Sequence, residues 1–157
     1  MPHIAGLAPA EVQAIEILDL VRTKTGLTRE DLFAEAASRT CRRRLKRLWK
    51  LSVAGVDSPP ETHMRLILRD LADWENQTEF FDATGRYLTA ADLYDPVSRL
   101  ALFYDGEHHL QRSQRDYDSE VGQQLLLQGI TPVRITAGQI RNPEQLRSLV
   151  SALQKRK

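Results

Sequence analysis

The sequence predicts an α/β (α+β) fold, with a mixed central sheet covered by helices and a short helical segment before it. The order of periodic segments from residue 61 onward is helix, three strands, helix, strand and helix. A strand-helix-strand connection generally places a sheet between helix layers. The run VAGVDSPP (53–60) marks a boundary, because its glycine and prolines suit a break before a helix. We therefore expect a helical N-terminal segment over 1–57 and a second domain over 58–157.

Three short helices are expected in the N-terminal segment. Apolar residues recur near helical spacing over 9–23, and Gly26 ends that helix. Thr28 and Asp31 fit a capping pair for a helix near 29–38. A third helix, over 40–51, is strongly basic although the net charge of the chain is only +1. Its basic side chains are candidates for contact with DNA phosphates, and a solvated helix face is the alternative: Arg42, Arg43, Arg44, Lys46 and Arg47.

The second domain alternates strands and helices. The expected elements in order are a helix from Glu61 to about Asp73, strands near 76–82, 86–94 and 98–105, a helix near 116–128, a strand over 130–136 and a helix from Asn142 to Leu153. Gly85 lies in the turn between the first two strands, and Gly129 ends the helix before the last strand. We expect that last strand to be short and central in the sheet.

Composition restricts the location of the protein and the role of its cysteine. No apolar run approaches the roughly 20 residues that a membrane helix needs. The first residues lack the basic region and apolar core of a signal peptide, so we expect a cytoplasmic protein that does not enter a membrane. The single Cys41 can form neither an internal disulfide nor a thiolate cluster, and we expect it to be a packing residue.

Acidic and imidazole side chains gather where two predicted strands end. Asp92 closes the second strand, Asp105 closes the third, and His109 follows four residues later. Phosphodiester hydrolysis needs a hard cation at the scissile phosphate and a group that moves protons near neutral pH. We expect Asp92 to bind the cation, because a strand end holds a carboxylate rigidly. Aspartate is also common beside turns, so a purely structural role for Asp92 and Asp105 stays open.

A series of motifs runs from about Ser58 to Leu153. PPETHMR carries Glu61 and Arg65, Asp92 closes a strand, and FYDGEHH (103–109) follows the next strand. Asp118, Gly129 and ITPVRIT with its Arg134 come after them. In this order and spacing the chain resembles the PD-(D/E)xK nuclease superfamily. It is most similar to the very-short-patch-repair-like endonuclease domains that are common in actinobacterial proteins and their phages.

The resemblance implies a restriction-endonuclease-like α/β/α sandwich that cleaves DNA with Mg²⁺ or Mn²⁺. Asp92 and the main-chain carbonyl of Tyr104 would then bind the metal. Glu61 would support the metal or orient a base, while Asp105 and His109 would handle the proton. Asp118 stands at the acidic position that precedes a helix in the family.

The chain departs from the family pattern at three places. Phe103 replaces the glutamate that binds metal in most relatives, although the repair-endonuclease branch accepts an apolar residue there and uses a main-chain carbonyl instead. Ile130 replaces an aromatic residue. The basic residue expected shortly after Asp118 is missing, because Ser119, Glu120 and Val121 stand in its place.

These observations leave three functional hypotheses. The first is a metal-dependent DNA endonuclease. The second is a catalytically impaired protein of the same fold that binds DNA or acts as a regulatory, antitoxin-like or phage-defence component. The third is an unrelated α/β binding domain whose acids are turn residues. DNA is the expected partner in the first, and both a homodimer and a larger complex stay open.

Overall fold

The computed structural model describes residues 4–36, 41–106 and 112–155, and the side chains of 112–118 are outside that description. The chain forms two compact units, Met1–Ile67 and Leu68–Lys157. The division falls at the end of the helix that follows Ser58-Pro59-Pro60, whereas the predicted boundary lies before it. Each unit is described below by itself.

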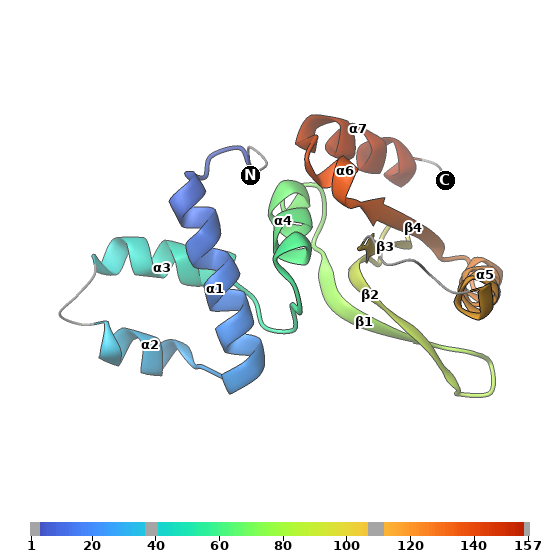
Figure 1. The fold of residues 1–157 in the computed structure, drawn as a ribbon, viewed down its shortest axis with the longest axis horizontal. Helices are drawn as coiled ribbons and strands as arrows, with labels where there is room; N and C mark the ends of the chain where they lie inside the picture. Colours follow the sequence, from blue (N-terminus) through green and yellow to red (C-terminus); the bar gives the residue numbers. More distant parts are fainter. Residues whose placement is uncertain (1–3, 37–40, 107–111, 156–157) are drawn as a thin grey trace. The chain divides into compact units, whose positions relative to one another are not determined.

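The first unit is built from helices. They are α1 (Pro9–Thr25), α2 (Arg29–Glu35), α3 (Arg42–Leu51) and α4 (Pro59–Leu68), as Figure 1 shows. Gly26 ends α1 in the left-handed region at φ 66°, and its N–H donates to the Arg22 carbonyl. The hydroxyl of Thr28 accepts a hydrogen bond from the Asp31 N–H and so caps the N-terminus of α2. The helices predicted near 9–23, 29–38 and 40–51 are therefore confirmed.

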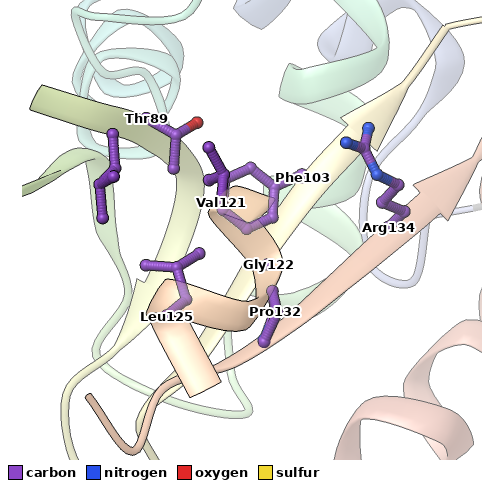
Figure 2. A pocket seen from close by; sticks show the side chains of 8 residues that line it. Thr89, Phe103, Val121, Gly122, Leu125, Pro132 and Arg134 are labelled. Carbon is purple, nitrogen blue, oxygen red and sulfur yellow. The ribbon is translucent and has the colours of Figure 1, made fainter. Parts of the chain in front are cut away.

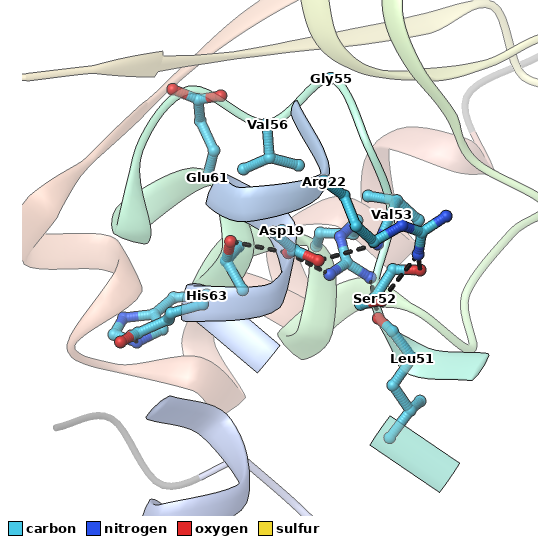
Figure 3. A network of polar contacts seen from close by, with 12 residues as sticks. Asp19, Arg22, Leu51, Ser52, Val53, Gly55, Val56, Glu61 and His63 are labelled. Atoms are coloured by element: carbon cyan, nitrogen blue, oxygen red, sulfur yellow. Dashed lines mark hydrogen bonds and ion pairs between the residues drawn. The ribbon is translucent and has the colours of Figure 1, made fainter. Parts of the chain in front are cut away.

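A buried carboxylate holds the helices of this unit together (Figure 3). Asp19 lies on α1 and is 0% exposed. Its Oδ1 accepts from the Val53 N–H at 2.8 Å, and its Oδ2 accepts from Thr62 at 2.8 Å and from Arg65 at 2.6 Å. Val53 follows α3, and the other two donors lie on α4, so a single side chain ties three parts of the unit together.

Arg65 extends this network. Its second terminal nitrogen donates to the Leu51 carbonyl at 2.7 Å, at the end of α3. Arg22, one turn beyond Asp19 on α1, donates to the carbonyl and hydroxyl of Ser52 at 2.5 and 2.7 Å. The guanidinium of Arg22 also lies 4.0 Å from the centre of the Trp49 ring. The last turn of α3 is therefore fixed by two arginines from different helices.

Replacing Asp19 with alanine is predicted to lower the free energy of unfolding of the first unit by about 3–5 kcal/mol, because the buried Arg65 loses its counter-charge. Urea unfolding followed by circular dichroism measures this change. Asp31→Ala is the matched control, since it removes an exposed carboxylate that accepts from the N–H and the hydroxyl of Thr28 and should cost about 1 kcal/mol. Equal losses in the two variants would contradict the central role of Asp19.

The second unit is mixed α/β with an open four-stranded mixed sheet. Its strands are β1 (Glu75–Phe81), β2 (Tyr87–Asp95), β3 (Leu100–Asp105) and β4 (Thr131–Thr136), in the spatial order β1-β2-β3-β4. The first three pair antiparallel, and β4 pairs parallel with β3 through the crossover helix α5 (Arg112–Leu127). Two further helices follow, α6 (Ala137–Ile140) and α7 (Pro143–Gln154). The predicted order of strands and helices is confirmed, and α6 is an additional element.

The turn between β1 and β2 is closed by Asp82. Its carboxylate accepts from the Thr84 hydroxyl at 2.6 Å, from the Thr84 N–H at 2.8 Å and from the Arg86 N–H at 2.9 Å. These bonds, with the Thr84 hydroxyl foremost, lower the pKa of Asp82 to about 2. Gly85 takes φ 83°, which a glycine adopts without strain. The predicted hairpin is confirmed at this position.

The prediction that the last strand is central was wrong. Among the described strands β4 lies at the edge of the sheet, next to β3 alone. Pro132 gives the physical reason, because proline has no N–H to donate to a second neighbour and is confined to edge strands and bulges. This signal was present in the sequence ITPVRIT.

Both faces of the sheet are covered. Leu100, Ala101 and Leu102 are all buried, although successive strand residues point to opposite faces. On one face, Ala101 belongs to a core cluster with Val121 and Leu125 of α5. Leu100 pairs with Asp95 of β2, whose carboxylate accepts from Gln154 of α7 at 3.0 Å. Helices α5 and α7 therefore contact different faces.

Candidate active site

The Asp92 carboxylate lies where the pairing of β2 with β3 stops. The last paired residues on this side are Leu93 and Leu102. Beyond them, Asp92 Oδ2 accepts a hydrogen bond from the Tyr104 N–H at 2.6 Å, which takes the place of a ladder bond. Asp92 Oδ1 accepts from the side-chain amide of Gln77 at 3.0 Å. The carboxylate is therefore held at a fixed position between three strands.

Gln77 is a site residue that sequence reasoning missed. It lies on β1 between Asn76 and Thr78, which pair with Leu93 and Ala91. Its φ is 50°, a left-handed value that is uncommon outside glycine. Backbone strain of this kind persists where the surroundings impose it, and here the strained residue bonds to Asp92. The sequence ENQTEFF gives no local signal for this conformation.

The main-chain carbonyl of Tyr104 faces the same side of β3 as its N–H. In an antiparallel pair, one residue exchanges both its N–H and its C=O with the residue opposite, so the two groups point the same way. The Tyr104 N–H points to Asp92. The carbonyl oxygen and the carboxylate therefore border the same gap between β2 and β3.

The strand-end reasoning that placed Asp92 was wrong in one respect. Asp92 lies within β2, which continues to Asp95. Because the strands are antiparallel, Asp95 pairs with Leu100 at the start of β3, and Asp105 lies at the other end of β3, paired with Thr136. Antiparallel pairing, and not a common rim of strand ends, brings Asp92 next to Tyr104.

The other predicted catalytic residues are placed as follows. Glu61 lies in the first turn of α4 and accepts hydrogen bonds from the Ser58 hydroxyl at 2.6 Å and the Asp57 N–H at 3.1 Å, which is a capping role. It belongs to the first unit, while Asp92 belongs to the second. His109 and the side chain of Asp118 lie outside the described residues. Within the described part of the chain, no three His, Cys, Asp or Glu side chains gather as a metal site.

A cavity of about 270 Å³ adjoins this region on the face covered by α5 (Figure 2). Its lining comes from β2, β3, β4 and α5: Leu88, Thr89, Phe103, Val121, Gly122, Leu125, Pro132 and Arg134. Phe103 is directly paired with Arg134 across β3 and β4. Phe103 packs against the core cluster of this face, so its side chain contributes to the wall.

The basic residues of α3 lie on the surface of the first unit. Leu45 and Leu48 are buried, whereas Arg42, Arg43 and Arg44 are exposed. Lys46 is exposed too, and Arg47 bonds to the Gly6 carbonyl at 2.6 Å and approaches Glu11 at 3.4 Å. The helix therefore presents cations to solvent over most of its surface, as a phosphate-binding helix requires.

The packing role predicted for Cys41 was wrong. Cys41 is exposed and immediately precedes α3. The nearby backbone N–H groups of Arg44 and Arg43 favour the thiolate and lower the pKa of the thiol.

Comparison of the chain with protein-family models, curated proteins and solved structures found no match. Among the described helices, none combines the length and apolar character that crossing a bilayer requires.

Replacing Asp92 with alanine is predicted to leave the Tyr104 N–H without its acceptor. We expect the free energy of unfolding to fall by about 1–2 kcal/mol. The amide hydrogen of Tyr104 should exchange faster than that of Leu102, because Leu102 keeps its partner in the ladder. Amide exchange measured by NMR tests this. Asp92→Asn is the matched control, because its carbonyl oxygen can still accept the bond. Unchanged exchange at Tyr104 in the alanine variant would contradict the contact.

Proposed function

We propose that the second unit is a restriction-endonuclease-like α/β/α domain that hydrolyses phosphodiester bonds in DNA with a divalent metal. The observation that carries the proposal is the pairing of a fixed carboxylate, Asp92, with the main-chain of Tyr104 at the gap between β2 and β3. The contacts of α5 and α7 with different faces of the sheet support the three-layer arrangement.

The donors at this gap suit a hard cation. A carboxylate oxygen and a peptide carbonyl are the ligands that Mg²⁺ and Mn²⁺ take, with water completing the shell. Asp92 and the Tyr104 carbonyl would hold the ion, and Phe103 offers no donor. When bound, the ion supplies charge neutralisation at the scissile phosphate and polarises a water molecule.

The surrounding side chains have distinct tasks in this proposal. Gln77 orients the carboxylate of Asp92 through its amide, which leaves the outer lone pairs of that carboxylate directed to the gap. Asp105 and His109 are the proposed proton carriers, and Asp118 is proposed to assist as an acid of the family motif. Arg134 is proposed to contact the phosphate backbone, since guanidinium forms paired hydrogen bonds with phosphate.

A second candidate function is a protein of the same fold that binds DNA without cutting it, as an antitoxin-like, regulatory or phage-defence component. One observation favours it: Phe103 stands opposite Arg134 and packs into the core instead of offering a carboxylate. Asp92 would then be a structural residue that holds Tyr104. The two candidates differ in whether metal binds at the gap.

Wild type is predicted to cleave plasmid or oligonucleotide DNA with Mg²⁺ or Mn²⁺, and Asp92→Ala is predicted to lose cleavage. Asp92→Asn should lose it too, because an amide binds a divalent cation poorly yet keeps the hydrogen bond to Tyr104. This variant separates the loss of metal from the loss of structure. Asp73→Ala, an exposed acid of the same unit, is the control and should cleave normally.

Cleavage that persists in Asp92→Asn would contradict the metal site. If no protein cleaves, the stabilising effect of Mg²⁺ decides between the candidates. A competent site gains roughly 2.7 kcal/mol at a hundredfold excess of metal over its dissociation constant, and a site that binds no metal gains nothing. DNA binding without metal stabilisation supports the second candidate.

The exposed arginines of α3 are proposed to contact DNA phosphates in either case. Arg43→Gln is predicted to reduce the slope of log K against log salt by about 0.9, the value for one phosphate contact on duplex DNA. Fluorescence anisotropy across a salt series measures the slope. Arg86→Gln, which removes an equally exposed charge from the β1–β2 hairpin, should leave the slope unchanged. Equal slopes for both variants and the wild type would remove α3 from the interface.

A further inference from the structure

Only Arg134, among the residues that line the cavity beside β3, has a task in the function proposed above. Five of its side chains are apolar and come from four elements: Leu88, Phe103, Val121, Leu125 and Pro132. Two polar side chains complete the lining, Thr89 on β2 and Arg134 on β4. Figure 2 shows the Phe103 ring beside Val121, with Arg134 at one side of the cavity. An apolar hollow with one cation at its edge suits a ligand with a flat apolar body and an anionic group.

The cavity adjoins the Asp92 gap through the register of the sheet. Phe103 pairs with Arg134 on one side. On the other side, Leu93 pairs with Leu102, so the next residues along, Asp92 and Phe103, are neighbours. Directly opposite residues in a sheet lie about 5 Å apart and face the same side. Asp92, Phe103 and Arg134 therefore form a row across three strands.

A glycine keeps the cavity open on the helix side. Gly122 lies in the interior of α5 among the lining residues, and a Cβ added there meets no heavy atom within 4 Å. Glycine weakens a helix interior more than any residue but proline. Its position at this wall leaves space that any larger side chain would fill.

We propose that this cavity receives one unstacked nucleobase of the bound nucleic acid. The base contacts the Phe103 ring, and Arg134 binds the phosphate attached to the same nucleotide. The inference rests on the proposed function, since the ligand is the nucleic acid whose backbone crosses the Asp92 gap. A volume of about 270 Å³ lies just below the usual range of small-molecule sites, so it suits a single ring system more than a larger cofactor. Enzymes that do chemistry on a base extrude it from the stack into a pocket of this kind, so a protein pocket can hold an unstacked base.

The test measures nucleotide binding without metal, so that it is independent of cleavage. The four deoxynucleoside 5′-monophosphates, their nucleosides and deoxyribose 5-phosphate are titrated into the full chain and followed by protein NMR. We expect nucleosides and nucleotides to shift the amide signals of Phe103 and Gly122. Deoxyribose 5-phosphate should bind about tenfold more weakly than the nucleotides, because it has no base to stack.

Two variants and a control decide the assignment. Gly122→Leu fills the cavity and should weaken nucleotide binding about tenfold or more, with an unchanged or higher melting temperature. Gln123→Leu places the same side chain at an exposed position of the same helix and should bind as wild type does. Arg134→Gln should weaken nucleotides and leave nucleosides unaffected.

Nucleotide binding that is equal in wild type and Gly122→Leu overturns the inference, as does binding of sugar phosphate and nucleotide with equal strength. Absence of any shift at Phe103 and Gly122 overturns it too. None of these results depends on cleavage. If the wild type cuts DNA but fails these binding tests, the proposed nuclease function stands and the base pocket is rejected. If the wild type binds nucleotides in this pocket but does not cut DNA, the nuclease function is rejected and the base pocket stands.

Discussion

The register of β3 decides which side chains meet in the second unit. This strand pairs antiparallel with β2 and parallel with β4, and its residues Leu100 to Leu102 are buried on both faces. A shift by one residue would turn every side chain to the opposite face and would exchange the places of the small Ala101 and the larger Leu100 and Leu102, which close packing opposes. The row of Asp92, Phe103 and Arg134 follows from this register alone. Both the proposed metal site and the cavity beside it are therefore consequences of how one short strand is packed.

The first unit is held by a different kind of interaction. Helices α1 and α4 and the segment after α3 meet at the buried Asp19, whose carboxylate accepts from Val53, Thr62 and Arg65. Such a network fixes one arrangement of α1, α3 and α4, because any other arrangement leaves a buried charge without a partner. On the surface of α3, Arg42, Arg43 and Arg44 are exposed, whereas Arg47 bonds to the Gly6 carbonyl.

Much of the fold was predictable from local patterns, whereas the site was predictable only in part. Helix and strand periods, Gly26, Gly85 and Thr28 have local physical causes, and the elements that they mark are found as expected. The position of β4 was misjudged because its apolar character was given more weight than Pro132. Asp92 lies next to Tyr104, as the resemblance implied, but the expected common rim of strand ends is replaced by antiparallel pairing. Gln77 and Asp19 could not be selected at all, because each acts on a partner that the chain brings near only after folding.

The hydrogen bond from Tyr104 to Asp92 affects how the presence of this aspartate in a sequence is interpreted. The carboxylate that would hold a metal also completes the backbone pairing of β3. Selection for a stable sheet therefore preserves Asp92 even in a chain that has lost all activity. Retention of this aspartate in other sequences would identify the fold and not the enzyme. Catalysis is better judged from a residue that has no structural task. Sequences that have lost activity would first change at acids and histidines outside the hydrogen-bonded ladder of the sheet.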